Sequence, residues 1–260
     1  GGTCAVTVGV TATTAGIGSE TSTVLTTSLG DTAAGVTATL TVTGAPEPTF
    51  TAAYTPASIA QGGVATLAYT IDNAAALVDA TSLAFSETLP AGVTVATTPA
   101  ASNGCGGTLT ATAGSGAMSY TAGTVVAGAN CVVSFDVTSA TVGDVTGTTT
   151  ALTSSLGDSG TASASLSVTA ADIPSFAKAF SPTTIVQGDI STLTFTIDNT
   201  TALVDASALS FTDNMPTDMV VAAVPNIVNA CTGGSVTAAA GSNSIVLAGA
   251  TVPASGTCTV

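Results

Sequence analysis

The feature that most constrains this chain is an internal repeat. The segment QGGVATLAYTIDNAAALVDATSLAFSETLP (61–90) aligns without gaps to QGDISTLTFTIDNTTALVDASALSFTDNMP (187–216), and sixteen of the thirty positions are identical. The five cysteines recur at nearly the same spacing of 127 or 126 residues, as Cys4, Cys131 and Cys258 and as Cys105 and Cys231. Because self-similarity at a fixed period marks a repeated structural unit, we expect tandem units of about 127 residues.

The phase of the repeat predicts the domain organisation. Residues 1–44 are expected to be the C-terminal part of a preceding repeat, and residues 45–171 a complete repeat. Residues 172–260 are expected to be the N-terminal part of the next repeat, without its last strands. Prolines at both junctions end the preceding strands. The chain is therefore predicted to be a segment of a longer, processed polypeptide.

Short alternating runs indicate an all-β fold. Small and β-branched residues dominate the sequence and favour strands and tight turns. Within one repeat, turn residues separate strands expected at about 49–55, 64–72, 82–88, 92–97, 107–112, 117–121, 131–138, 145–155 and 161–169. This number of strands at this length predicts tandem immunoglobulin-like β-sandwich domains.

Several motifs support this assignment. They are FAKAFSP (176–182), STLTFTIDN (191–199), LSFTDNMP (209–216), CTGG (231–234), GTCTV (256–260) and LTSSLG (152–157). Together they resemble the Ig-like repeat domains found in tandem in very large bacterial surface proteins. The resemblance implies a β-sandwich fold and an adhesin-like or fibre-like role in a family of mostly unknown function. The first copy departs from the pattern, because Ala52 stands where the family has lysine.

The cysteine phase predicts two disulfides, Cys105–Cys131 and Cys231–Cys258, and places the partner of Cys4 outside the chain. Each closes a loop of about 27 residues and is worth about 3.5 kcal/mol on a loop-entropy estimate. A zinc site is not expected, since the chain has neither a CxxC motif nor histidine. Disulfides imply an extracellular, oxidising compartment.

Composition excludes several function classes. The chain has one lysine, no arginine and no histidine, with a net charge of −14. Nucleic acid is therefore not an expected partner, because phosphate binding needs clustered cations. Triads that require histidine cannot form, and we do not expect an enzyme. No apolar run reaches the length of a membrane-spanning helix, so this segment is not expected to insert into a membrane.

The repeated stretch TIDNxxALVDA has two interpretations. One is a calcium site formed by Asp72, Asn73 and Asp79, and again by Asp198, Asn199 and Asp205, with Glu87 or Asp213 as a further ligand. The other is a strand end followed by a turn in which the Asp and Asn side chains bond to nearby backbone groups. The spacing lacks a dense DxDxDG loop, which favours the turn; otherwise no cofactor is expected.

Lys178 raises a separate hypothesis. It alternates with Phe176 and Phe180 at strand spacing, so the three side chains share one face. A lysine buried there could form an intramolecular Lys–Asn isopeptide bond with a strand beyond residue 260. The alternative is a solitary charge that reaches solvent, and Ala52 at the equivalent position favours this alternative.

The sequence therefore predicts a structural segment of a long extracellular fibre or cell-surface stalk, with neighbouring copies of the repeat as partners. An adhesin module that binds a receptor or glycan through its end loops is an alternative. A third hypothesis is a subunit that polymerises when residues 4–44 of one copy complete the open sandwich of its neighbour.

Overall fold

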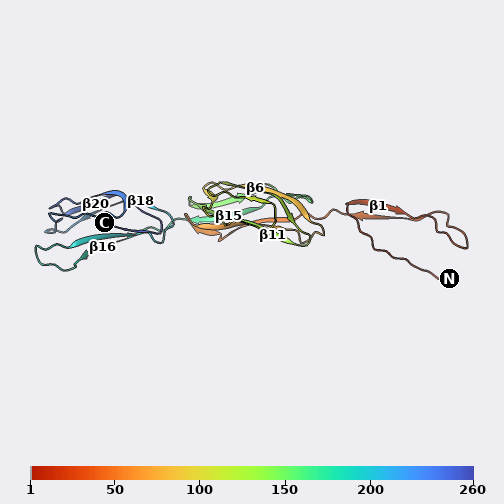
Figure 1. Cartoon of the computed structure of the whole chain (residues 1–260), viewed down its shortest axis with the longest axis horizontal. Coiled ribbons are helices and arrows are strands. Elements are labelled where there is room, and N and C mark those ends of the chain that lie inside the picture. The colour runs from red at the N-terminus through yellow and green to blue at the C-terminus, as the bar shows by residue number, and fades with distance from the viewer. Residues whose placement is uncertain (1) are drawn as a thin grey trace.

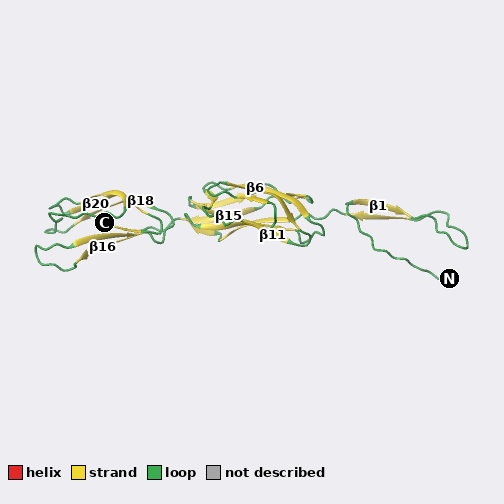
Figure 2. Cartoon of the chain, in the orientation of Figure 1, coloured by secondary structure: helices red, strands yellow, loops and turns green. Residues whose placement is uncertain are grey.

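The structure is a computed structural model that describes residues 2–260, and all regular elements in this range are β-strands (Figure 2). Three groups of strands follow one another along the long axis of the molecule (Figure 1). They are an N-terminal hairpin, a central β-sandwich and a C-terminal pair of sheets. No helix long and apolar enough to cross a membrane occurs in residues 2–260. The fold is all-β, as the alternating runs predicted.

The central sandwich contains thirteen strands. They are β3 (Thr49–Thr55), β4 (Ser58–Ala60), β5 (Val64–Asp72), β6 (Ala80–Thr88), β7 (Val93–Val95), β8 (Ser102–Asn103), β9 (Thr108–Thr110), β10 (Ala117–Val125), β11 (Asn130–Ser139), β12 (Gly143–Thr148), β13 (Thr153–Ser154), β14 (Gly157–Asp158) and β15 (Ser163–Thr169). One sheet has the order β3-β5-β11-β7, with β8 also paired to β11, and the facing sheet has the order β14-β13-β6-β10-β9. The third sheet, β12-β15-β4, completes the sandwich.

The core of the sandwich follows from the period of two along its strands. Every second residue of β5 is buried, as is every second residue of its antiparallel neighbour β11. Aromatic rings fill the centre: Phe85 lies 4.8 Å from Phe50 and 4.9 Å from Tyr69 between ring centroids. Rings at this distance and tilted to each other pack favourably, beyond the area that they bury.

One predicted strand, 145–155, is in fact two strands in different sheets. β12 pairs with β15, whereas β13 pairs with β6 and β14. Between them the Thr149 hydroxyl accepts a hydrogen bond from Ala162 N, and Thr150 N donates to Ser86 O. These bonds hold the chain to one sheet and then to the other, so it crosses the edge of the sandwich. Period-two alternation alone cannot show such a crossing.

The C-terminal group contains β16 (Ser175–Ser181), β17 (Thr192–Asp198), β18 (Ala206–Asn214), β19 (Thr232–Thr237), β20 (Ser244–Val252) and β21 (Thr257–Thr259). They form two sheets, β16-β17-β21 and β18-β20-β19. Phe176 of β16 is 55% exposed, whereas the equivalent Phe50 in the central sandwich is 8% exposed. Residues 184–186, which align with β4, form no strand. In the central sandwich β15 supplies the pairing partner of β4.

The N-terminal hairpin consists of β1 (Gly16–Thr21) and β2 (Thr37–Val42). When the repeats are aligned, β1 and β2 correspond to β12 and β15, and the two antiparallel pairs match in register. The likeness includes a hydroxyl–hydroxyl hydrogen bond, Thr21–Thr37 at 2.7 Å in β1–β2 and Thr148–Ser163 at 2.8 Å in β12–β15. Equivalent segments of the repeat therefore form the same hairpin with and without a sandwich around it.

Candidate functional site

The repeated TIDN stretch forms a corner between β5 and β6. Asp72 Oδ1 accepts a hydrogen bond from Ala74 N at 2.8 Å, which is the bond of an Asx turn. Asp79 Oδ1 accepts from Ala127 N at 2.8 Å and so ties the corner to the loop after β10. Each aspartate therefore bonds to backbone through one oxygen.

Asn73 is the buried centre of this corner. Its side chain is 2% exposed, and Nδ2 donates to Val78 O at 2.9 Å. Two longer bonds, each 3.4 Å, reach Val125 O and Val126 O at the end of β10. One side-chain amide thus donates hydrogen bonds to carbonyl groups of two segments that are far apart in sequence. Buried carbonyl groups need such partners, because an unpaired one destabilises the fold. Its Oδ1 is buried without a partner among residues 2–260.

The second copy repeats these bonds residue by residue. They are Asp198 Oδ1 from Thr200 N at 2.9 Å, Asn199 Nδ2 to Val204 O at 3.0 Å and to Pro253 O at 3.1 Å, and Asp205 Oδ1 from Ala254 N at 2.8 Å. The side-chain and backbone hydrogen bonds of Thr200 hold the pKa of Asp198 below its ordinary value. The corner is therefore the same cross-link in both copies.

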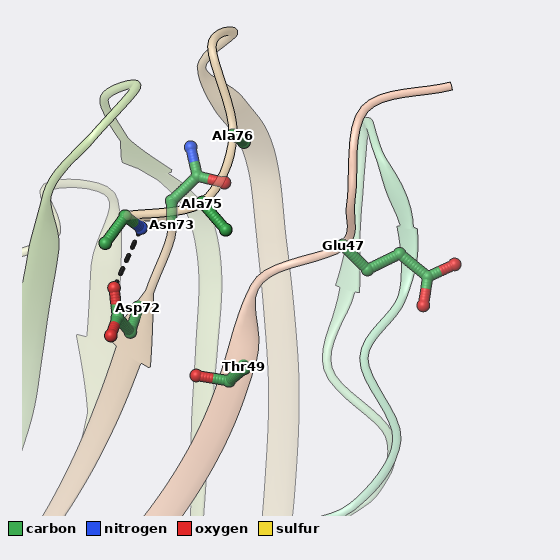
Figure 3. A pocket seen from close by; sticks show the side chains of 7 residues that line it. Glu47, Thr49, Asp72, Asn73, Ala75 and Ala76 are labelled. Atoms are coloured by element: carbon green, nitrogen blue, oxygen red, sulfur yellow. Dashed lines mark hydrogen bonds between the residues drawn. The ribbon is translucent and has the colours of Figure 1, made fainter. Parts of the chain in front are cut away.

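A shallow pocket lies beside the first corner, between the start of β3 and the Asx turn (Figure 3). Glu47 and Asp72 both line it, but the Glu47 carboxylate points away from Asp72. Within residues 2–260, no three His, Cys, Asp or Glu side chains are grouped so that they could hold a metal ion. Glu87, which the calcium hypothesis added as a ligand, instead lies in the core at 4% exposure. Calcium binding stays the alternative hypothesis for this corner.

The core contains a polar pair that sequence reasoning missed. Tyr69 Oη donates to Glu87 Oε2 at 2.6 Å, and both side chains are buried. Burial raises the pKa of Glu87, and the hydrogen bond from Tyr69 offsets part of that rise. Burial first, and the neighbouring Glu87 carboxylate second, raise the pKa of Tyr69. Gly147 closes over the pair: an added Cβ would lie 2.1 Å from Glu87 Oε1.

In the second copy, Asp213 is the acid equivalent to Glu87, and its partner comes from a different strand. Phe195 replaces Tyr69 and has no hydroxyl, and Lys178, opposite Phe195 on β16, forms an ion pair with Asp213. Lys178 takes the position of Ala52 in the first copy. Its side chain is 52% exposed on β16. The isopeptide hypothesis stays a prediction. Within residues 2–260, the partner of Lys178 is the Asp213 carboxylate.

One disulfide closes the equivalent end of each sandwich. Cys105 is bonded to Cys131, and Cys231 to Cys258, while Cys4 is free and exposed. The first bridge joins the loop after β8 to the start of β11. Tyr120 Oη supports the same loop by donating to Cys105 O at 3.1 Å and to Gly106 O at 2.9 Å. The bridge therefore fixes a glycine-rich segment to the core.

These features define a tandem β-sandwich protein with one disulfide and one hydrogen-bonded corner per unit. The Asp and Asn side chains of each corner bond to the backbone of their own unit. The chain belongs to the DUF7933 family, a domain of unknown function, whose family model matches residues 48–168 and 174–260. The sequence signals that carry this membership lie in both copies of the repeat.

No curated protein matches the chain. Among solved structures, the chain is similar to the type II cohesin dyad from the adaptor ScaA scaffoldin of Acetivibrio cellulolyticus. The identity is 8%, the match covers 81% of this chain and 84% of that one, and the TM-score is 0.29.

Proposed function

We propose that the chain is a structural segment of an extracellular fibre or cell-surface stalk built from disulfide-linked β-sandwich repeats. The observation that carries the proposal is the linear order of the three groups of strands, which place their repeats along one axis (Figure 1). The joint between β15 and β16 is residues 170–174 only, and it contains Pro174. A short joint with proline limits the relative motion of neighbouring units.

The charge distribution supports the same role. Fifteen acidic residues and one lysine are spread along the chain rather than gathered in a site. Negative charge on exposed strands opposes edge-to-edge pairing between fibres. The two disulfides suit an oxidising, extracellular compartment. Adhesion through end loops receives no comparable support, since the loops contain mostly glycine, alanine, serine and threonine.

Immunogold electron microscopy of the source cells tests the proposal. Antibodies against the central sandwich should decorate thin surface filaments at regular intervals along their length. Labelling confined to the cell interior, or to isolated particles without filaments, would overturn it.

Strand donation is the second candidate, and a specific observation favours it. The Phe176 and Phe180 side chains lie open on β16, whereas the equivalent Phe50 and Tyr54 on β3 are buried and β15 packs against β3 in the central sandwich. Residues 16–42 form a hairpin of that same kind, and Leu40 on it is 49% exposed, whereas the equivalent Leu166 is fully buried. The open face and the hairpin are complementary parts of one sandwich.

Sedimentation velocity of the 260-residue chain over a range of concentrations tests strand donation. We expect head-to-tail oligomers that disappear when residues 4–44 are deleted. A chain that stays monomeric at every concentration would contradict strand donation. The fibre proposal would then still be tested by the electron microscopy.

A further inference from the structure

Each of the central and C-terminal units contains two small features, and the turn of the central unit contacts the corner of the C-terminal unit. The first feature is the glycine turn, residues 61–63 in the central unit and 187–189 in the C-terminal unit. The second is the Leu-Val corner, residues Leu77–Val78 and Leu203–Val204 in the same two units. The Leu203–Val204 corner lies against the glycine turn at Gly62. A Cβ added to Gly62 would lie 2.9 Å from both Leu203 O and Val204 Cγ1.

Gly62 is required at this contact for two independent reasons. Its φ is +80°, a left-handed conformation that glycine adopts at little cost. Its missing side chain also leaves the space that Val204 Cγ1 occupies. Gly188, the equivalent residue, has a φ of +96°, but no atom lies within 4 Å of an added Cβ. Backbone conformation therefore explains glycine at both positions, whereas close contact is present only at Gly62.

Exposure of the corners shows the same difference. Leu77 is 93% exposed, and its counterpart Leu203 is 51% exposed. Val78 is 48% exposed, whereas Val204 is half-buried. The chain thus contains one engaged corner and one free corner, and one engaged glycine turn and one free one. Val186 (73%) and Ile190 (69%) are exposed beside the free turn.

We infer that the Leu-Val corner and the glycine turn are a head-to-tail interface used at every junction between repeats. The free Leu77–Val78 corner then receives the glycine turn of a preceding copy of the repeat. The free turn at Gly188, flanked by Val186 and Ile190, receives the Leu-Val corner of a following copy. The occupant is a second copy of the repeat because the contact at Gly62 shows that pairing within this chain. The inference rests on the proposed function, and it adds the contact that sets the angle between repeats.

The test measures the distance between equivalent points in the two units of the full chain. Spin labels attached to a ketone-bearing unnatural amino acid at Ala113 and Ala239, both exposed and 126 residues apart, avoid the cysteines. Double electron–electron resonance should give one narrow distance distribution. Val204→Asp should at least double its width, because a charge replaces the methyl group at the contact. Val78→Asp, the same change at the free corner, should leave the width unchanged.

A second pair of variants covers the case in which Val204→Asp unfolds its unit. Asparagine tolerates a positive φ, so Gly62→Asn keeps the turn but fills the space that Val204 occupies, and Gly188→Asn makes the same change where nothing lies nearby. We expect a broader distribution for Gly62→Asn only. Equal widths within either pair of folded variants would overturn the interface. These measurements do not depend on the microscopy, so the interface can fail while the fibre proposal stands.

Discussion

Tyr69 and Glu87 form a buried hydrogen bond of 2.6 Å between facing sheets, and the second repeat replaces it with an ion pair between Lys178 and Asp213. The acid is kept at the equivalent position in both copies, while its partner moves from β5 in the first to β16 in the second. The requirement is thus for a donor near the acid, and either of two neighbouring strands supplies it.

Removing the donor should destabilise the central sandwich. Tyr69→Phe leaves the Glu87 carboxylate buried without its hydroxyl partner, at an expected cost of about 1–3 kcal/mol in the free energy of unfolding. Ala52→Lys combined with Tyr69→Phe recreates the arrangement of the second repeat and should recover part of the loss. Urea unfolding followed by circular dichroism measures both. A double variant no more stable than Tyr69→Phe would show that the donors are not interchangeable.

The stability of the central sandwich should depend on pH through Glu87. Burial raises the folded-state pKa of Glu87 above its ordinary value of 4.5. The folded state then binds more protons than the unfolded state just above pH 4.5, so the free energy of unfolding falls as pH rises through that window. Glu87→Gln keeps a group that can accept the Tyr69 bond and should remove this part of the pH dependence. Identical pH profiles for the two proteins would rule the effect out.

Tyr54 should tolerate loss of its hydroxyl. Tyr54 Oη is buried without a hydrogen-bond partner within residues 2–260, and burial, with a smaller effect of Glu87, raises the pKa of Tyr54 to about 12. The equivalent residue in the second repeat is Phe180. Tyr54→Phe removes an unsatisfied polar group and should leave thermal stability unchanged or raise it. A clear drop in the melting temperature would reveal a partner for the hydroxyl.

Each disulfide should stabilise its own unit. Replacing Cys105 and Cys131 together by serine should lower the free energy of unfolding of the central sandwich by about 3.5 kcal/mol. Cys4→Ser is the control, because Cys4 is free and exposed and its replacement should change nothing. Guanidinium unfolding under non-reducing conditions compares the three proteins. An equal loss for Cys4→Ser would mean that the cysteine effect is not that of the bridge.

The corner should depend on its amide rather than on calcium. Asn73→Ala removes a buried donor to Val78 O and should cost about 1–3 kcal/mol. Asp72→Ala removes an exposed turn bond and should cost less. We expect neither calcium nor a chelator to move the unfolding midpoint of the parent chain. A midpoint that rises with calcium concentration would establish binding to the folded state.

The sequence alone determined the period and the all-β class, and it favoured the turn interpretation of the repeated corner over the calcium one. These follow from local rules: side chains alternate along a strand, and Asp and Asn bond to nearby backbone in turns. The same rules gave the strand at 64–72 with its bounds intact. The same rules predicted a single strand at 145–155, whereas the chain changes sheets within this segment. Local rules miss such a crossing, because it depends on strand partners that are distant in sequence.

Only the tertiary structure decided what the polar residues do. Glu87 looked like a corner ligand until the fold placed it beside Tyr69, eighteen residues away. Likewise, Gly62 and Gly188 are alike in sequence and in the sign of φ, yet only Gly62 meets a neighbouring unit. Local sequence fixes backbone conformation through short-range sterics. Burial, hydrogen-bond partners and contacts between units depend on which distant segments the whole chain brings together.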